Sequence, residues 1–169
     1  MTRVGTMAAT SVFVAFGVIL PIAFHFVGAM GPVFLPMHIP VLMAGLFLGP
    51  VSGLTVGVIT PVLSSVLTGM PPLIPILPLM VMELAVYGTV AGYLYQVRHL
   101  PLAVALITAM IAGRLAALVG VYGLANLFHL KLTPMAYLAG LTAGLPGIAV
   151  QLIVVPLLLK RLENSLLKK

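Results

Sequence analysis

Apolar residues form six long runs along the chain, and short basic or Gly- and Pro-rich segments separate them. The runs cover residues 5–27, 36–50, 53–68, 73–96, 101–127 and 135–159. A helix that crosses the hydrocarbon core of a bilayer needs about 20 apolar residues. The pattern therefore predicts an all-α, compact bundle of six transmembrane helices, with residues 1–169 forming a single membrane domain.

Prolines divide the second and third of these spans, and both are short for a bilayer. Pro36 and Pro40 interrupt the second span, Pro61 interrupts the third, and Gly49-Pro50 marks the turn between them. Short or broken spans are tolerated where they pack against protein or line a cavity. We therefore expect a pocket near this pair of helices.

Composition places the chain in lipid. Hydrophobic residues make up 62% of it and charged residues 6%, whereas a soluble domain carries about 25% charged residues. Residues 4–82 contain no Asp, Glu, Lys or Arg. A water-soluble globular protein and a disordered chain are both excluded, and the absence of cysteine excludes a thiolate metal site.

The basic residues predict the orientation of the bundle. An even number of spans places both termini on one side, together with Arg98, and the opposite side carries Lys131 alone. By the positive-inside rule both termini are then cytoplasmic. The basic residues act as topology signals, so we expect no nucleic-acid partner. Those on the cytoplasmic side are Arg3, Arg98, Lys160, Arg161, Lys168 and Lys169.

Two ionisable residues lie deep inside predicted spans, Glu83 in the fourth and Arg114 in the fifth. Each is about 15 residues from the turn at Arg98, or roughly 23 Å along a helix. An antiparallel hairpin therefore places them at one depth, in the outer half of the membrane. Pairing would offset the cost of burying each charge. Two interpretations stay open, a structural salt bridge and contact with a polar ligand, and both can hold together.

Other polar residues lie at a similar level. Thr60, Ser64 and Thr68 follow at intervals of four residues and predict a hydroxyl stripe on the third span. Together with the two charges, these side chains describe a pocket for a small molecule better than a surface that faces lipid. The candidate substrate-binding residues are His38, Thr60, Ser64, Glu83, Tyr87, Arg114, Tyr122 and Asn126. Gln151 is interpreted as a packing or partner contact.

Small residues four positions apart recur along the spans and let helices approach closely. Examples are Gly53 with Gly57 and Gly88 with Gly92. The spacing indicates either packing within the bundle or a surface for a partner membrane protein. The outward loops at 28–35 and 69–72 are rich in Gly and Pro, and they are either plain turns or lids over an outward pocket.

No enzyme signature is present. The chain lacks GxSxG, HExxH and GxxxxGK[ST] motifs, and one intramembrane carboxylate is too few for a two-carboxylate mechanism or a two-metal site. The remaining roles are binding, transport and structure, and we expect this chain itself to bind no cofactor or metal.

One stretch resembles a known family. Residues 34–53 read FLPMHIPVLMAGLFLGPVSG, and the similarity continues through Thr60-Pro61, SSVLTGMPPL at 64–73 and ELAVYG at 83–88. This stretch is similar to the substrate-binding membrane subunit (S component) of energy-coupling factor (ECF) vitamin transporters. The resemblance implies a six-helix protein of a prokaryotic inner membrane that binds a vitamin in its extracellular half. It also implies partners, a membrane T component and two cytoplasmic ATPases that hydrolyse ATP, and a toppling movement that delivers the vitamin inward.

The resemblance further implies caps over the ligand at about residues 28–37 and 69–78, and a docking face on the first helix. The family often carries Ala-xxx-Ala there, whereas this chain has Gly5-xxx-Ala9 and Ser11-xxx-Ala15. Ala8, Ala9 and Ala15 are the candidates for contact with the T component.

Arg114 suits an anionic ligand, and the hydroxyl stripe suits one with several hydrogen-bonding groups. Within this family the motifs resemble the pantothenate-type or pyridoxine-type branch most. Pantothenate has a carboxylate, an amide and hydroxyls and is placed first, ahead of a pyridoxine-type vitamin or hydroxymethylpyrimidine. Two alternatives remain from other classes. One is a standalone secondary transporter with Glu83 as its proton carrier, and the other is a structural membrane protein.

Overall fold

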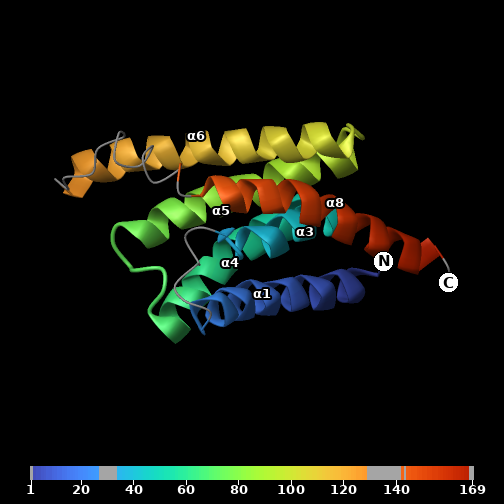
Figure 1. Ribbon diagram of the computed structural model, residues 1–169, viewed down its shortest axis with the longest axis horizontal. Helices are drawn as coiled ribbons and strands as arrows, with labels where there is room; N and C mark the ends of the chain where they lie inside the picture. The colour runs from blue at the N-terminus through green and yellow to red at the C-terminus, as the bar shows by residue number, and fades with distance from the viewer. Residues whose placement is uncertain (1, 27–33, 129–141, 143, 168–169) are drawn as a thin grey trace.

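The computed structural model describes residues 2–26, 34–128, 142 and 144–167. These residues form α-helices and contain no strand, which confirms the all-α prediction. A five-residue π-helix, η1 (Tyr93–Val97), continues α5. The α-helices are α1 (Arg3–Phe26), α3 (His38–Leu48), α4 (Pro50–Thr68), α5 (Ile76–Gly92), α6 (Leu102–Phe128) and α8 (Leu145–Leu167) (Figure 1).

Five of these helices are long and apolar enough to cross a membrane. The exception is α3, whose 11 residues extend about 16 Å, roughly half of the hydrocarbon core. It lies inside the bundle and packs against α1, α4, α5 and α8 (Figure 1). Almost every residue from His38 to Leu46 is buried, as expected for a helix that is apolar on all sides. A short second span was correctly predicted.

The third span is not short, so that prediction was wrong. α4 begins at Pro50, continues past Pro61 and reaches 19 residues. Pro50 occupies the first helical turn, where its missing N–H group removes no hydrogen bond. Gly49 has a φ of 102° and makes the sharp connection from α3, a conformation that favours glycine.

The last helix also differs from its predicted range of 135–159. It begins at Leu145 and continues to Leu167, while residues 135–141 and 143 lie outside the described residues. Pro146 stands in its first turn, where proline is tolerated. The helix passes residue 159 because Lys, Arg, Leu and Glu are strong helix formers even after the apolar run ends.

Glycines bring α3, α4 and α5 into backbone contact. A Cβ atom on Gly45 of α3 or Gly53 of α4 would overlap the backbone of Gly88, and one on Gly57 would overlap the backbone of Leu84. The small-residue spacing at Gly53, Gly57 and Gly88 therefore serves packing within the bundle, the first of the two interpretations.

Gly88→Ala is expected to lower the free energy of unfolding by about 1–3 kcal/mol, because the new methyl group forces α4 and α5 apart. Thermal unfolding of the purified protein in detergent measures this effect. Gly123→Ala on α6 is the matched control, since no atom lies within 4 Å of its added Cβ. Equal melting temperatures for the two variants would contradict the close α4–α5 contact.

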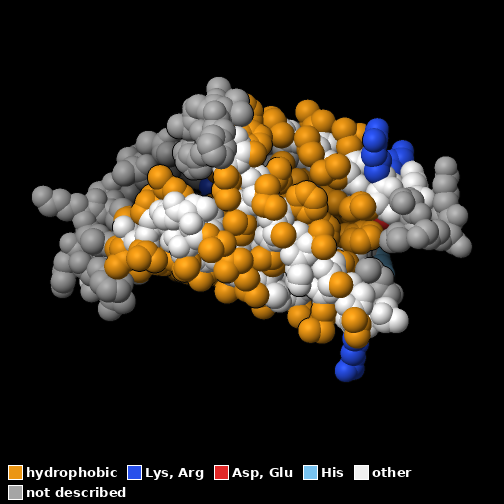
Figure 2. Space-filling view, turned by 90° about the horizontal axis from the view of Figure 1, so that it is seen from below, with side chains coloured by type: hydrophobic (Ala, Val, Ile, Leu, Met, Phe, Trp, Pro, Cys, Tyr) orange, Lys and Arg blue, Asp and Glu red, His pale blue; other side chains and the backbone are white. Residues whose placement is uncertain are grey.

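Basic residues gather at one end of the bundle. The start of α1, the turn between η1 and α6, and the last turns of α8 lie at this end (Figure 1). Arg3, Arg98, Lys160 and Arg161 are exposed there, and Figure 2 shows Lys and Arg side chains at this end while hydrophobic side chains cover the middle. The start of α1 and the end of α8 therefore lie at the same end of the described bundle. That this basic end is cytoplasmic stays a prediction, and Lys131, Lys168 and Lys169 lie outside the described residues.

Candidate functional site

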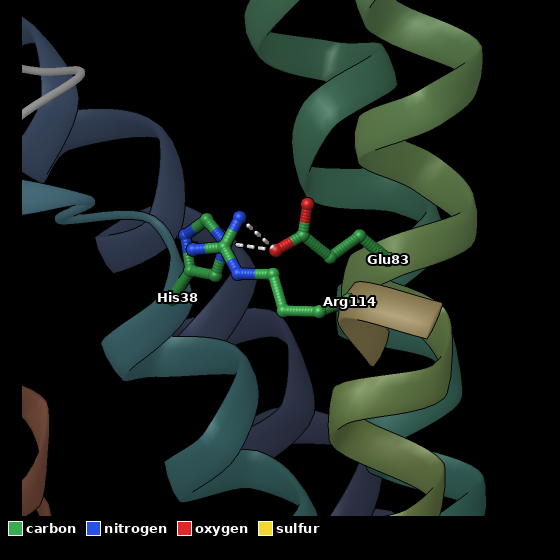
Figure 3. A network of polar contacts seen from close by, with 3 residues as sticks. All are labelled: His38, Glu83 and Arg114. Carbon is green, nitrogen blue, oxygen red and sulfur yellow. Dashed lines mark hydrogen bonds and ion pairs between the residues drawn. The ribbon is translucent and has the colours of Figure 1, made fainter. Parts of the chain in front are cut away.

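A buried carboxylate on α5 joins side chains from three helices. Nη1 of Arg114, on α6, lies 2.8 Å from Oε1 of Glu83. Nε2 of His38, at the start of α3, lies 3.3 Å from the same oxygen (Figure 3). We call His38, Glu83 and Arg114 the Glu83 cluster. The predicted pairing of Glu83 with Arg114 is confirmed.

Helix geometry explains why these side chains meet. α5 and α6 form an antiparallel hairpin about the turn at Arg98, so residues equally distant from that turn lie at equal depth. His38 reaches the pair because α3 packs on α5 and begins at this level. A carboxylate that is paired with Arg114 can only accept hydrogen bonds, so Nε2 of His38 must carry the hydrogen of this contact. His38 Nδ1 is buried and has no hydrogen-bond partner among the described residues.

Tyr87 completes the surroundings of His38. It lies one turn after Glu83 and is fully buried. Its ring packs edge-on against the imidazole of His38, with centroids 5.3 Å apart and an interplanar angle of 66°. Gly113 on α6 makes room for the tyrosine ring, because a Cβ there would overlap it. The packing holds the His38 ring in place.

A cavity of about 300 Å³ lies beside the cluster, between α5, α6 and α8. It is open on its outer side, where Ile111 and Leu115 are exposed. This volume is at the lower end of the range typical of small-molecule sites. Arg114 provides the charge in its wall, and Tyr87 also lines it, although the hydroxyl oxygen of Tyr87 is itself buried. The remaining lining is apolar and consists of Ile107, Met110, Ile111, Leu115, Ile148 and Leu152. One cation in an apolar wall suits an anion with an apolar body.

The predicted hydroxyl stripe does not line this cavity. Ser64 is buried and donates to the carbonyl of Met70 at 2.8 Å, and Thr68 donates to the carbonyl of Ser64 at 2.7 Å. Thr60 packs against Gly17 of α1, and its buried Oγ1 has no hydrogen-bond partner within the described part of the chain. Ser64 and Thr68 therefore satisfy nearby backbone carbonyls, those of Met70 and Ser64, as these residue types often do.

Tyr122 and Asn126 are exposed on α6 and are not brought to the cluster, with Tyr122 at 68% exposure. Their depth in the bundle follows from the sequence, but the rotation of α6 about its axis turns them to another side of the helix. At 3.6 residues per turn they lie about 80° and 120° around the helix from Arg114.

Two of the three alanines proposed for partner contact share an outer face of α1. Ala8 and Ala15 are exposed, and their spacing of seven residues places them on the same side of the helix. Ala9 is half-buried and turns toward the bundle. The structure thus leaves Ala8 and Ala15 accessible.

Sequence reasoning missed the contribution of α8 to the site. Ile148 and Leu152 line the cavity, and Gln151 between them is fully buried with no hydrogen-bond partner for either amide atom among the described residues. The amide side chain of Gln151 inside an apolar span was the signal in the sequence that could have indicated this contribution. The described residues hold no group of three or more His, Asp or Glu side chains that could bind a metal.

Comparison with protein-family models matches residues 5–159 to the family described as ECF transporter, substrate-specific component. The match covers every helix that contributes to the Glu83 cluster and the cavity. Searches of curated proteins and of solved structures return no match.

Proposed function

The chain belongs to the substrate-specific components of ECF transporters, and from this premise we propose that it binds pantothenate with high affinity in the cavity beside Arg114. As a member of that family it is a multi-pass membrane transport protein for a vitamin-type substrate, and not an enzyme. The observation that carries the proposal is that Arg114 lines the cavity while Glu83 holds its guanidinium.

The chemistry of Arg114 supports an anionic substrate. A guanidinium offers five N–H donors in a planar fork and binds carboxylates through two parallel hydrogen bonds. Glu83 engages Nη1 at 2.8 Å, which fixes the direction of the fork before a ligand arrives. A preorganised donor loses less conformational freedom on binding.

The shape and lining of the cavity support the order of the candidates. Pantothenate carries one carboxylate, which suits Arg114, and a dimethyl-substituted body, which suits walls such as Met110 and Leu152. A pyridoxine-type vitamin and hydroxymethylpyrimidine lack a carboxylate, so neither would use the charge of Arg114.

The placement of the site supports import. With the basic end in the cytoplasm, the Glu83 cluster lies in the outer half of the inner membrane of a prokaryotic cell. The exposed Ala8 and Ala15 are then the contact for a T component, which works with two ATPases. In this proposal the protein topples in the membrane to present the vitamin to the cytoplasmic side.

Mass spectrometry of the purified protein tests the substrate. We expect pantothenate to co-purify, and calorimetric titration of ligand-free protein to show saturable binding of pantothenate. Pyridoxine and hydroxymethylpyrimidine are the controls, and each should bind at least about tenfold more weakly, which corresponds to about 1.4 kcal/mol. Tighter binding of either neutral compound would overturn pantothenate as the substrate.

Uptake by cells separates the proposal from its alternatives. An ECF component requires its partners and ATP, so removal of the T component should stop uptake. A secondary transporter with Glu83 as proton carrier would instead stop when an uncoupler dissipates the proton gradient while ATP remains. A purely structural protein would show no saturable ligand.

A further inference from the structure

Among the described residues, the charges of the Glu83 cluster balance before any ligand binds. The negative Glu83 and the positive Arg114 cancel, and both contacts to Oε1 are short enough to be direct. The other charged residues of the described helices are far from the cluster. They are Arg3, Arg98, Lys160, Arg161 and Glu163, and they lie in the segments at the basic end (Figure 1).

A carboxylate ligand at Arg114 upsets this balance. Two carboxylates would then share one guanidinium in a site where Glu83 is 5% exposed and His38 is 2% exposed. An uncompensated charge is costly in a buried site and in the membrane interior. The bound state therefore needs one more positive charge.

His38 is placed to supply it. α5 places Glu83 and Tyr87 against its ring, and α6 places Arg114 at the same carboxylate oxygen. Tyr87 cannot gain a positive charge, because a phenol is either neutral or anionic. α4 has no charged residue, the inward polar residue of α8 is the neutral Gln151, and on α1 the side chain of His25 lies outside the described ones.

On the imidazole of His38, Nδ1 is the nitrogen left to take a second proton. Nε2 faces the carboxylate of Glu83, and the buried Nδ1 has no hydrogen-bond partner among the described residues. When both nitrogens carry hydrogen the ring is a double donor and a cation. That cation would offset the extra negative charge, with its Nε2 3.3 Å from the Glu83 carboxylate.

We propose that the Glu83 cluster binds its carboxylate ligand together with one proton, which His38 takes up at Nδ1. The proton comes from the aqueous phase, one N–H bond forms, and the ligand stays a carboxylate. The inference rests on the proposed function in requiring an anionic ligand. It makes His38 the residue that links affinity to pH.

Calorimetric titration of the ligand-free protein with pantothenate, in phosphate and in Tris at the same pH, measures the proton. The two buffers have different heats of ionisation, so the difference in binding heat gives the protons taken up per ligand. We expect uptake close to one proton per ligand bound. The affinity should then fall by nearly tenfold for each unit of rising pH.

His38→Gln should retain a hydrogen bond to Glu83 but bind pantothenate with no proton uptake and no pH dependence. His99→Asn is the control, because His99 is exposed at the basic end and its φ of 53° suits asparagine. It should behave as the unmodified protein does. Continued proton uptake in His38→Gln would overturn the assignment to His38. If that variant fails to fold, the proton count of the unmodified protein decides the coupling.

Failure of the inference and failure of the proposed function give different results. Pantothenate binding without proton uptake overturns the coupling and leaves the substrate in place. Absence of pantothenate binding at every pH overturns the substrate. The same titration with propionate, a carboxylate on a short apolar body, then decides the coupling. Proton uptake with propionate supports it, and binding without uptake or no binding overturns it.

Discussion

Arg114→Ala is expected to abolish measurable high-affinity binding of pantothenate. Truncating one partner of a buried charged pair costs about 2–5 kcal/mol, which corresponds to a loss of at least about 30-fold in affinity. Arg114→Lys should recover only part of it, because an ammonium keeps the charge but lacks the planar fork. Calorimetric titration in detergent measures both variants.

Arg98→Ala is the matched control for this loss. Arg98 is exposed at the basic end and lies far along the hairpin from the cavity, so its removal should leave the affinity unchanged. A folded Arg114→Ala protein that binds pantothenate as tightly as the unmodified chain would show that the guanidinium does not hold the ligand.

Glu83→Ala is expected to lower the free energy of unfolding by about 3–5 kcal/mol, because it leaves the charge of Arg114 buried without its carboxylate partner. Thermal unfolding of the purified protein and its yield from membranes measure the loss. Combining Glu83→Ala with Arg114→Ala should restore part of the stability, because the double variant has no unpaired charge.

Glu163→Gln provides the comparison outside the cluster. Glu163 accepts a hydrogen bond from the Tyr95 hydroxyl at 3.0 Å and is only half-buried, so its replacement should cost no more than about 1 kcal/mol. A Glu83→Ala protein as stable as this control would mean that the pair contributes little to the fold.

The depth of buried charges could be predicted from the sequence, and their neighbours from other helices could not. The rise per residue is fixed, so counting from Arg98 places Glu83 and Arg114 at one level. The contact from His38 spans 45 positions. It depends on how closely α3 approaches α5, which the Gly45–Gly88 contact determines.

The direction in which a residue points was also beyond the sequence. Apolar residues cover nearly all faces of α6, so the pattern does not say which side faces lipid. Tyr122 and Asn126 lie on α6 beyond Arg114, but they are exposed and do not line the cavity. For Ser64 the competing effect was local, because its hydroxyl satisfies the Met70 carbonyl.

The positions of proline predicted the bounds of one helix correctly and those of another wrongly. It correctly indicated that α3 is short and that the chain turns at Gly49. It wrongly suggested a broken third span, because Pro61 is accommodated inside α4. In a membrane bundle, neighbouring helices and hydroxyl side chains can satisfy the backbone groups that proline leaves unpaired.

A structure of the protein bound to pantothenate tests the central claim most directly. The account predicts a carboxylate oxygen of the vitamin about 2.7–2.9 Å from a guanidinium nitrogen of Arg114, the usual length of a charge-assisted hydrogen bond. The dimethyl-bearing body should lie between α5, α6 and α8 against Met110 and Leu152. A vitamin bound elsewhere, with Arg114 still engaged by Glu83 and no ligand in this cavity, would contradict the account.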